Sequence, residues 1–515
     1  MSSDINTESA SALVARMRLS GIKIWADGAR LCYLAPKGTL GPDDLSELHS
    51  LKLNVIELLT STPNPTDFAR ERSGRFPLTY AQRWFLNALG PNDSQYRLLC
   101  VATRIVGAVD FGRLRASCFM LTRIHDSLRL QIPEFKESAS QELMTPSDTE
   151  LKFLDLSKHR SEERDGGVIS FIQAQMLNRS ESAVRSLFET FLIRLGQNEH
   201  VLAHVMNHLI SDALSLRILK RDLWRLYSRY AGDAERIQAS ISTAFFDYSI
   251  LQCNDRENWA STHGQYWERR LQSAKRLSIF QQARGVAIAS RLAVAPIELN
   301  AELTGDLLRV SRLEKTTLTL TVLAAYVCFL SRWCATKDVI LQFMTTGRDK
   351  KELGEVIGFF AAPLFLRIQL LEHDTFVDLI RKVKEEYTTA HLHSDSGRIA
   401  AQVPRPDFLR SPTFNWIPEG SIDSANPKLG SSSGANDLEL TDFDVANPFD
   451  QIEWSDNTDN EPAIDFSMSE GGIAGHIVYP RSGTTASLVS QFASEFIILT
   501  RRLVEAPLAL VRDIN

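Results

Sequence analysis

The sequence predicts a two-lobed α/β protein that follows a small α+β domain, and three observations support this prediction. From residue 76 to the C-terminus, segments with strand-like alternation follow segments with helical spacing, which is typical of an α/β protein. The chain has 515 residues, 44% of them hydrophobic, which is enough for more than one domain. A turn-rich unit precedes these segments. The expected divisions are a small domain over 1–60, a linker over 61–75, and lobes over 76–255 and 256–515.

Composition and charge exclude several functional classes. The net charge of -6 is modest and the charges are mixed, so we expect neither a nucleic-acid surface nor a polybasic membrane anchor. The segment Met1–Ala12 is polar and carries Asp4 and Glu8, unlike a secretory signal. The longest apolar run, Leu318–Phe329, is too short to span a membrane and is expected to be a core helix. These features favour a cytoplasmic location.

The cysteines are scattered, and none forms a Cys-x-x-Cys pair. Most have apolar neighbours, as reduced core thiols do. We therefore expect neither disulfides nor a cysteine metal site, and no other metal site is predicted. The residues are Cys32, Cys100, Cys118, Cys253, Cys328 and Cys334.

The first unit contains a hairpin signal between two helical segments. The alternating runs Ile22–Trp25 and Ala29–Tyr33 flank Asp27-Gly28, a favoured hairpin turn. A helix with apolar spacing is expected before the hairpin, and a second after it. The apolar positions of these helices are Leu13, Val14 and Met17 in the first, and Leu45, Leu48, Leu51, Val55 and Leu58 in the second.

His208 is the main candidate for chemistry. The pattern predicts a strand over Glu199–His208 and a helix over Asp212–Tyr230, which places His208 where a strand gives way to a helix. A neutral imidazole can direct the proton of a nucleophile that attacks a thioester. The alternative is a hydrogen-bonded structural histidine at a strand end, because His-x-x-x-Asp is common by chance. Asp212 either orients the imidazole, caps the helix or pairs with a distant arginine, and we favour a structural role.

The segment from Pro418 to Asn447 lacks periodicity and is rich in Ser, Gly, Asn and Asp. It is longer than an ordinary connection. We expect an acidic surface loop there.

Six segments in order resemble the motifs of the condensation-domain family of non-ribosomal peptide synthetases, from Phe76 almost to the end of the chain. The third contains the core that the family writes His-His-x-x-x-Asp-Gly. The segments are Pro77–Leu86, Arg123–Arg129, Asn207–Ala213, Phe246–Tyr248, Gly347-Arg348 with Ile357–Leu364, and Arg410–Phe414.

The resemblance implies a chloramphenicol-acetyltransferase-like fold, a V-shaped pseudo-dimer of two lobes with a central tunnel. By the same resemblance, His208 is the central catalytic residue, and Arg348 forms a buried ion pair with Asp212. Ser215 supports the core, and His125 is expected to be structural.

Two residues depart from the family pattern. Asn207 replaces the first histidine, although an amide still hydrogen-bonds. Ala213 replaces the glycine, which adds a methyl group where the family brings the substrate close to the backbone. Heterocyclisation domains carry aspartate at the position of Asn207, but they lack the histidine that this chain keeps as His208.

The first sixty residues resemble the β-hairpin docking domains of the kind known from tubulysin assembly. In that family the edge of the hairpin adds a strand from the tail of an upstream subunit. Basic side chains here would attract an acidic tail; for each of them, an ordinary solvated charge is the alternative. The candidate docking residues are Lys23, Trp25, Arg30, Tyr33 and Lys37.

The layout resembles free-standing condensation enzymes that offload chains, such as that of enacyloxin assembly. It implies transfer of an acyl, peptidyl or polyketide thioester from the phosphopantetheine of an upstream carrier protein to an amine or alcohol, forming an amide or ester. The acceptor is either a free small molecule or carrier-bound, and release is favoured. No cofactor is expected in this chain, and neither nucleic acid nor membrane is an expected partner. An inactive platform domain and a heterocyclisation-type variant remain alternatives.

Overall fold

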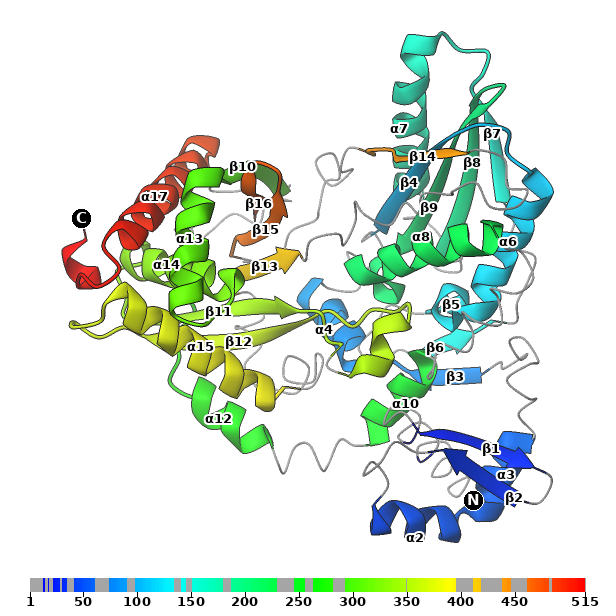
Figure 1. The fold of residues 1–515 in the computed structure, drawn as a ribbon, viewed down its shortest axis with the longest axis horizontal. Helices are drawn as coiled ribbons and strands as arrows, with labels where there is room; N and C mark the ends of the chain where they lie inside the picture. Colours follow the sequence, from blue (N-terminus) through cyan, green and yellow to red (C-terminus); the bar gives the residue numbers. More distant parts are fainter. Residues whose placement is uncertain are drawn as a thin grey trace. The chain divides into compact units, whose positions relative to one another are not determined.

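The computed structural model divides into two compact units (Figure 1). The first comprises 1–257, 348–360 and 420–446, and the second 258–347, 361–419 and 447–515. The residues that the structure describes are 13, 17, 22–27, 30–34, 41–60, 74–89, 98–133, 140–144, 151–178, 187–228, 245–254, 263–280, 292–348, 350–394, 411–417, 438–445, 461–480 and 484–514.

This division differs from a single boundary after residue 255, because two later segments belong to the first unit. Arg348 lies in one of them and pairs with Asp212. The other contains strand β14 (Glu439–Asp442), which pairs with β4 (Leu98–Val106). Part of the expected loop over 418–447 is therefore a strand, and the prediction was wrong there. Its residues 418–437 and 446–447 lie outside the described part of the chain.

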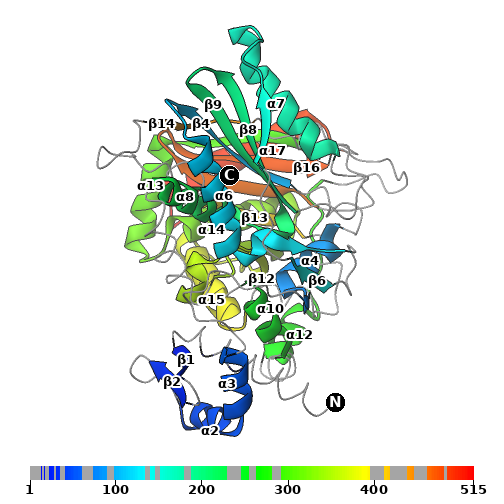
Figure 2. The ribbon, with the colours of Figure 1, turned by 90° about the vertical axis from the view of Figure 1, so that its right-hand side faces the viewer.

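The predicted hairpin is confirmed. Strands β1 (Lys23–Asp27) and β2 (Arg30–Leu34) pair antiparallel, and Asp27 pairs with Arg30 (Figure 2). The single helix expected after it is two helices, α2 (Pro42–Ser50) and α3 (Lys52–Thr60), because Leu51 leaves helical geometry. The buried core of this domain contains Leu13, Met17, Ile22, Ile24, Leu48 and Val55.

The central sheet of the first unit has the strand order β14-β4-β9-β8-β7. Its inner strand β9 alternates between two faces, as a strand must. Val201, Ala203 and Val205 join the core beneath helix α7 (Ser161–Asn178), whereas His200 and His204 belong to the opposite face. The remaining strands are β7 (Leu151–Asp155), β8 (Phe188–Gly196) and β9 (Glu199–Asn207).

Smaller elements complete this unit. Helices α6 (Phe111–Ile124) and α8 (Ala213–Ser228) pack together. A three-stranded sheet has the order β3-β6-β5. The other bounds are β3 (Gly74–Pro77), α4 (Tyr80–Leu89), β5 (Leu130–Gln131), β6 (Ser140–Leu143) and α10 (Phe245–Asn254).

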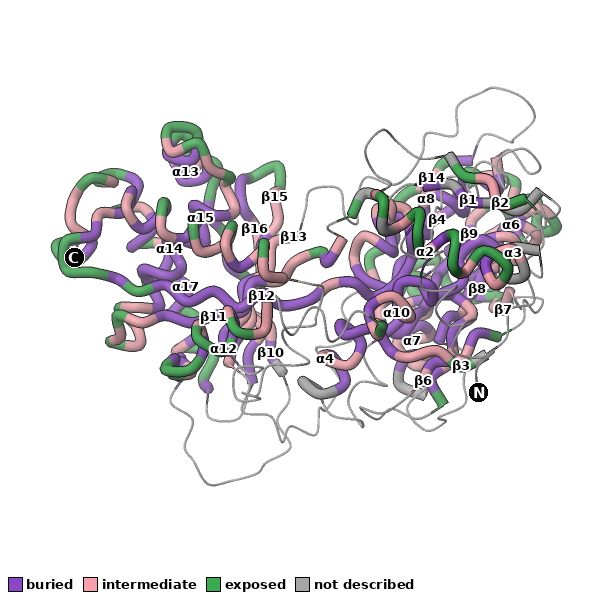
Figure 3. Tube along the Cα trace, turned by 90° about the horizontal axis from the view of Figure 1, so that it is seen from below, coloured by how far each residue is buried: buried purple, intermediate pink, exposed green. Residues whose placement is uncertain are grey.

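The second unit is built on a six-stranded sheet of order β10-β16-β15-β13-β11-β12. Helix α14 (Leu318–Trp333) lies in the interior of this unit, and every residue from Leu320 to Leu330 is buried (Figure 3). The expectation of a core helix is confirmed. The other elements are α12 (Gln265–Leu271), β10 (Leu292–Asn300), α13 (Ala301–Leu313), β11 (Asp338–Thr345), β12 (Ala362–Gln369), α15 (Phe376–Leu392), β13 (Thr413–Ile417), β15 (Ala463–Ser469), β16 (Gly472–Pro480) and α17 (Ala486–Glu505).

Within the described residues, no single helix has the length and apolar character to cross a membrane. The sharply bent pair α13 and α14 meets those criteria only when taken together. All six cysteines are described, and each is a free thiol in the structure.

Candidate functional site

His208 lies at the junction that the sequence predicts. Strand β9 ends at Asn207, a short 3-10 helix covers His208–Ile210, and α8 begins at Ala213. The Nδ1 atom of His208 is 2.8 Å from the carbonyl oxygen of Ser211. A carbonyl oxygen only accepts hydrogen bonds, so Nδ1 carries a proton and the neutral ring has its lone pair on Nε2. The turn therefore selects the tautomer in which Nε2 can act as a base.

The side chain of Asn207 caps the short helix that carries His208. Its Oδ1 accepts a hydrogen bond of 2.8 Å from the backbone N–H of Leu209. The Ser211 hydroxyl donates a hydrogen bond of 3.1 Å to the Asn207 carbonyl oxygen. Asn207 and Ser211 thus stabilise the two ends of the turn that carries the His208 side chain.

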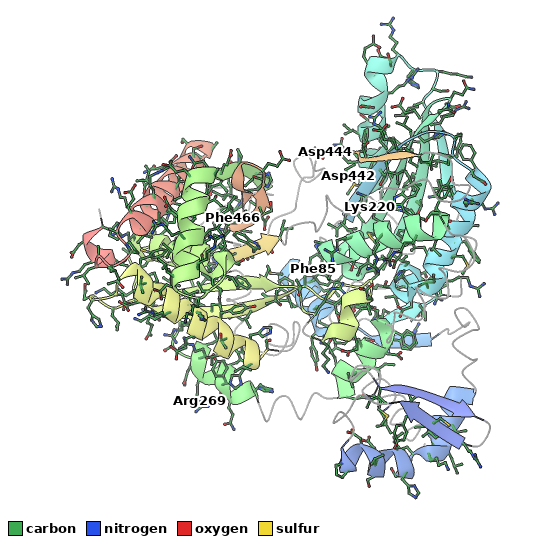
Figure 4. The ribbon with its side chains drawn as sticks, in the orientation of Figure 1. Phe85, Lys220, Arg269, Asp442, Asp444 and Phe466 are labelled. Atoms are coloured by element: carbon green, nitrogen blue, oxygen red, sulfur yellow. The ribbon has the colours of Figure 1, made fainter. Side chains whose placement is uncertain are left out.

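Two aromatic rings pack against the imidazole. Its centroid is 5.2 Å from that of Phe85 on α4 and 5.0 Å from that of Phe359, which meets it edge to face. The two phenyl rings also contact each other, with centroids 5.1 Å apart; Figure 4 labels Phe85. These rings restrict the orientation of His208. Both stand inside the family motifs, but sequence reasoning did not single them out.

Asp212 binds the segment that contains Arg348. Nη2 of Arg348 is 2.9 Å from Oδ1 and 3.2 Å from Oδ2 of the carboxylate. Oδ1 also accepts hydrogen bonds from the backbone N–H and the hydroxyl of Ser215, and Oδ2 accepts one from the N–H of Phe360. These contacts cap the start of α8, so the geometry gives Asp212 an organising position.

Ser215 and Ala213 lie in the first turn of α8. The Ser215 hydroxyl is 2.8 Å from the carbonyl oxygen of Gly358 and accepts a hydrogen bond from its N–H. A Cβ atom at Gly358 would lie 2.2 Å from Cδ2 of Phe245, so only glycine fits this approach. Ala213, the first residue of the helix, is half-buried. The first N–H groups of a helix lack acceptors inside the helix.

Gln82 ties the first motif to the His208 turn. Its Nε2 donates a hydrogen bond of 2.9 Å to the carbonyl oxygen of Leu209 and one of 3.0 Å to Oε1 of Gln141. Its Oε1 accepts from the N–H of Thr79, whose hydroxyl accepts from the N–H of Gln82. Gln82 is fully buried. Its presence in the first family motif was the only sequence signal for this role.

The second motif forms a separate network. His125 Nε2 lies 3.1 Å from Oδ2 of Asp222, and both side chains are buried. Burial alone raises the pKa of Asp222, but hydrogen bonds from His125 and Arg221 outweigh it and hold that pKa below its ordinary value. These contacts place His125 in a structural pair.

The candidate docking residues are only partly described. Lys23 and Trp25 lie in β1, but the positions of their side chains lie outside the described part of the structure. Arg30 and Tyr33 lie in β2 and are exposed. Lys37 lies outside the described residues. Across the described ranges, no cluster of three or more His, Cys, Asp or Glu side chains is suited to a metal ion.

Comparisons with family models match nearly the whole chain. Residues 72–515 match the Condensation domain, and residues 11–60 match the TubC N-terminal docking domain. Beauvericin nonribosomal cyclodepsipeptide synthetase of Beauveria bassiana is 27% identical over 341 residues, which are 65% of this chain and 10% of that protein. Enniatin synthase of Fusarium equiseti is 27% identical over 325 residues, 62% of this chain and 10% of that protein. The chain therefore spans only a small fraction of the length of these relatives.

Solved structures share the fold. The X-domain from teicoplanin biosynthesis has a TM-score of 0.68 at 21% identity, covering 88% of this chain and 100% of that one. The EpoB cyclization-docking bidomain from Sorangium cellulosum has a TM-score of 0.62 at 17% identity, covering 96% and 98%. A structure described as the molecular basis for condensation domain-mediated chain release from the enacyloxin polyketide synthase has a TM-score of 0.61 at 16% identity, covering 96% and 95%. The predicted α/β fold class is confirmed.

Proposed function

Because the chain belongs to the condensation-domain family, we propose that it transfers an acyl, peptidyl or polyketide chain from a carrier-bound phosphopantetheine thioester to an amine or alcohol. The C–S bond of the thioester breaks, and a C–N or C–O bond forms. The proton of the nucleophile passes to His208 and then to the departing thiolate. The products are an amide or ester and the free carrier thiol, so the reaction needs no oxidant or metal.

The observation that carries this proposal is the hydrogen bond from His208 Nδ1 to the Ser211 carbonyl oxygen, 2.8 Å long. Because it leaves the lone pair on Nε2, His208 can accept the nucleophile's proton or position the nucleophile. The phenyl rings of Phe85 and Phe359 pack against the imidazole and restrict its orientation.

The other core residues organise the reaction. Asp212, Arg348 and Ser215 hold the start of α8 in place through their shared contacts. The N–H groups around Ala213 are candidates to stabilise the oxyanion of the tetrahedral intermediate. Asn207 supports the turn from the other side. Bringing donor and nucleophile together supplies much of the rate.

The donor carrier would arrive through the N-terminal docking domain. The match of residues 11–60 to the TubC N-terminal docking domain supports an upstream synthase protein as the partner. An added strand from that partner would pair along the hairpin, with Arg30 and other basic residues attracting acidic side chains. The substrate is held on the partner's phosphopantetheine, and this chain supplies no cofactor of its own.

Chain release is the specific version that we favour. The enacyloxin structure, whose description names chain release, matches 96% of this chain. Release requires a free amine or alcohol as the acceptor, whereas chain extension requires a second carrier-bound amine. A panel of free and carrier-bound nucleophiles distinguishes the two.

The test follows the acyl load of a carrier protein by intact-protein mass spectrometry, with a panel of free amines, free alcohols and a carrier-bound amino acid. We expect acyl loss that depends on both an acceptor and His208, falling about 10²- to 10⁴-fold in His208→Ala. His159→Ala is the matched control, because His159 is exposed in the same unit. Equal rates in wild type and His208→Ala would contradict the mechanism.

A platform without catalysis is the second candidate, and Asn207 in place of the family's first histidine is the observation that favours it. In that case the carrier would bind through the docking domain, yet no acceptor would change its acyl load. The complete set of contacts around His208, Asp212 and Arg348 supports the enzyme instead.

A further inference from the structure

A pocket of about 380 Å³ opens on the first unit at the end of the central sheet away from His208. It is lined by Phe111, Phe153, Arg194, Gln197 and His200. His200 is eight residues before His208 on the same extended segment, which corresponds to roughly 27 Å. The pocket is therefore separate from the His208 turn, and its volume falls within the usual range for small-molecule sites.

The pocket forms where helix α6 begins. Arg194 pairs with His200 across β8 and β9, so their side chains share one face of the sheet. Phe111 is the first residue of α6 and meets His200 edge to face, with centroids 5.4 Å apart. It also meets Phe153 of β7 edge to face at 6.5 Å. Two aromatic side chains, Phe111 and Phe153, thus lie on one side of the His200 imidazole.

His200 is the unusual member of this group. His200 is only 2% exposed, and neither nitrogen of its ring has a hydrogen-bond partner among the described residues. Buried polar atoms are nearly always hydrogen-bonded, so an orphaned pair at a pocket points to a missing partner. Burial, together with the nearby Arg194, lowers the pKa of His200. The neutral ring therefore presents one N–H donor and one acceptor.

Phe111 and Phe153 add a second anomaly, because they are 47% and 57% exposed. Two large aromatic side chains side by side at the mouth of a pocket favour contact with a flat apolar group. The lining therefore combines aromatic walls with a polar floor.

Arg194 supplies the only charge among the lining residues. Its Nε donates to the carbonyl oxygen of Gly196 at 3.2 Å, and Nη1 lies 3.8 Å from Oδ2 of Asp155. Asp155 partly offsets the positive charge, but these contacts use only part of the five guanidinium N–H donors. Arginine binds carboxylates through charge-assisted and often bidentate hydrogen bonds.

We propose that this pocket is a second ligand site, which takes a small aromatic carboxylic acid with a hydroxyl group on its ring. The ring packs against Phe111 and Phe153, the hydroxyl group bonds to His200, and the carboxylate reaches Arg194. This inference does not depend on acyl transfer, because binding alone is its readout.

The experiment titrates the full-length protein with 4-hydroxybenzoate by isothermal calorimetry, and maps the ligand protons by saturation-transfer NMR. We expect saturable binding at one site. 4-Hydroxycyclohexanecarboxylate, which lacks the aromatic ring, and 4-hydroxybenzyl alcohol, which lacks the charge, should each bind at least about tenfold more weakly. Equal binding of all three compounds would overturn the assignment of the ligand class.

Three variants locate the site. Arg194→Gln and His200→Phe should each weaken binding about tenfold, and Phe153→Ala about threefold to tenfold. Arg501→Gln is the matched control, because the Arg501 side chain is 39% exposed, against 40% for Arg194, and lies in the other unit. It should leave binding unchanged.

Arg194→Gln and Phe153→Ala keep the test decisive even where His200→Phe disturbs folding, since the Arg194 side chain is 40% exposed and Phe153 is 57% exposed. No saturation at millimolar 4-hydroxybenzoate, or unchanged affinity in both Arg194→Gln and Phe153→Ala, would overturn the proposal.

Discussion

Arg348 and Asp212 form an ion pair that is buried at both ends. Their side chains are only 3% and 6% exposed, and Nη2 lies 2.9 Å from Oδ1. Nη1 of the same guanidinium donates to the carbonyl oxygens of Leu353 and Val356. The pair therefore fixes the segment after Arg348 against the start of α8, next to the His208 turn.

Removal of Arg348 should destabilise the protein strongly. Arg348→Ala leaves the Asp212 carboxylate buried without its cation, which costs about 3–5 kcal/mol. Urea denaturation measures the loss. Arg381→Ala is the control: it breaks an ion pair with Glu314 in which the arginine side chain is 63% exposed, and should cost less than about 1 kcal/mol. Similar losses of unfolding free energy in both variants would show that the burial of the Arg348–Asp212 pair does not set its contribution to stability.

Gly358 should tolerate no side chain. In Gly358→Ala the new Cβ would lie 2.2 Å from Cδ2 of Phe245, and overpacking of this kind costs about 1–3 kcal/mol. Gly354→Ala, in the same segment, meets no atom within 4 Å and should be neutral within a few tenths of a kcal/mol. Denaturation midpoints compare the two. Adding Phe245→Leu to Gly358→Ala should recover part of the loss, and no recovery would point to another cause.

Asn207 should support turnover through its cap. Asn207→Ala removes the acceptor for the Leu209 N–H, a loss of about 1 kcal/mol in cap energy, so we expect kcat for acyl transfer to fall about fivefold to tenfold. Asn207→Asp keeps an acceptor oxygen and should retain more activity than the alanine variant.

Asn300 provides the control for that prediction, because its Oδ1 caps α13 by accepting from the N–H of Leu303. Asn300→Ala should lose similar stability without the same loss of kcat. If Asn207→Ala keeps full turnover, the cap does not hold His208 in its working position.

Acid should weaken the fold partly through His204. This residue is 4% exposed, its Nδ1 lies 3.0 Å from the Thr190 hydroxyl, and burial lowers its pKa to about 3. The unfolded chain takes up the same proton near pH 6.5. Between those two values the unfolded state binds more protons, so stability falls as pH falls, by up to about 1.4 kcal/mol per pH unit.

His204→Gln should therefore flatten the dependence of unfolding free energy on pH between about pH 6 and pH 5. The exposed residue His373 provides the control variant His373→Gln, which should keep the slope of the wild type. An unchanged slope in His204→Gln would show that His204 is not buried in its neutral form.

The ion pair between Lys220 and Asp442 should stabilise the pairing of strand β14 with the central sheet. The lysine side chain is 2% exposed and forms an ion pair with Asp442 at the end of that strand (Figure 4). Asp442→Asn weakens the pair, so backbone amides of β14 should exchange hydrogen faster, while those of β9 stay protected. Hydrogen exchange with mass spectrometry measures both. Asp444→Asn, two residues away and exposed, should change neither rate.

The sequence alone determined the local features of this protein. Alternation and turn chemistry located the β1–β2 hairpin and the change from strand to helix at His208, because both depend on neighbours within a few residues. The ordered motifs were enough to indicate the condensation-domain family. The break at Leu51 was missed, because apolar spacing continues through it.

Only the tertiary structure decided which distant residues meet. Arg348 is 136 positions from Asp212, and Gln82 is 127 positions from Leu209. Strand β14 was hidden in a polar stretch, because its pairing depends on an edge offered by β4. The orphaned nitrogens of His200 were equally invisible, since burial and hydrogen bonding follow from the packing of several elements and leave no periodic trace in the chain.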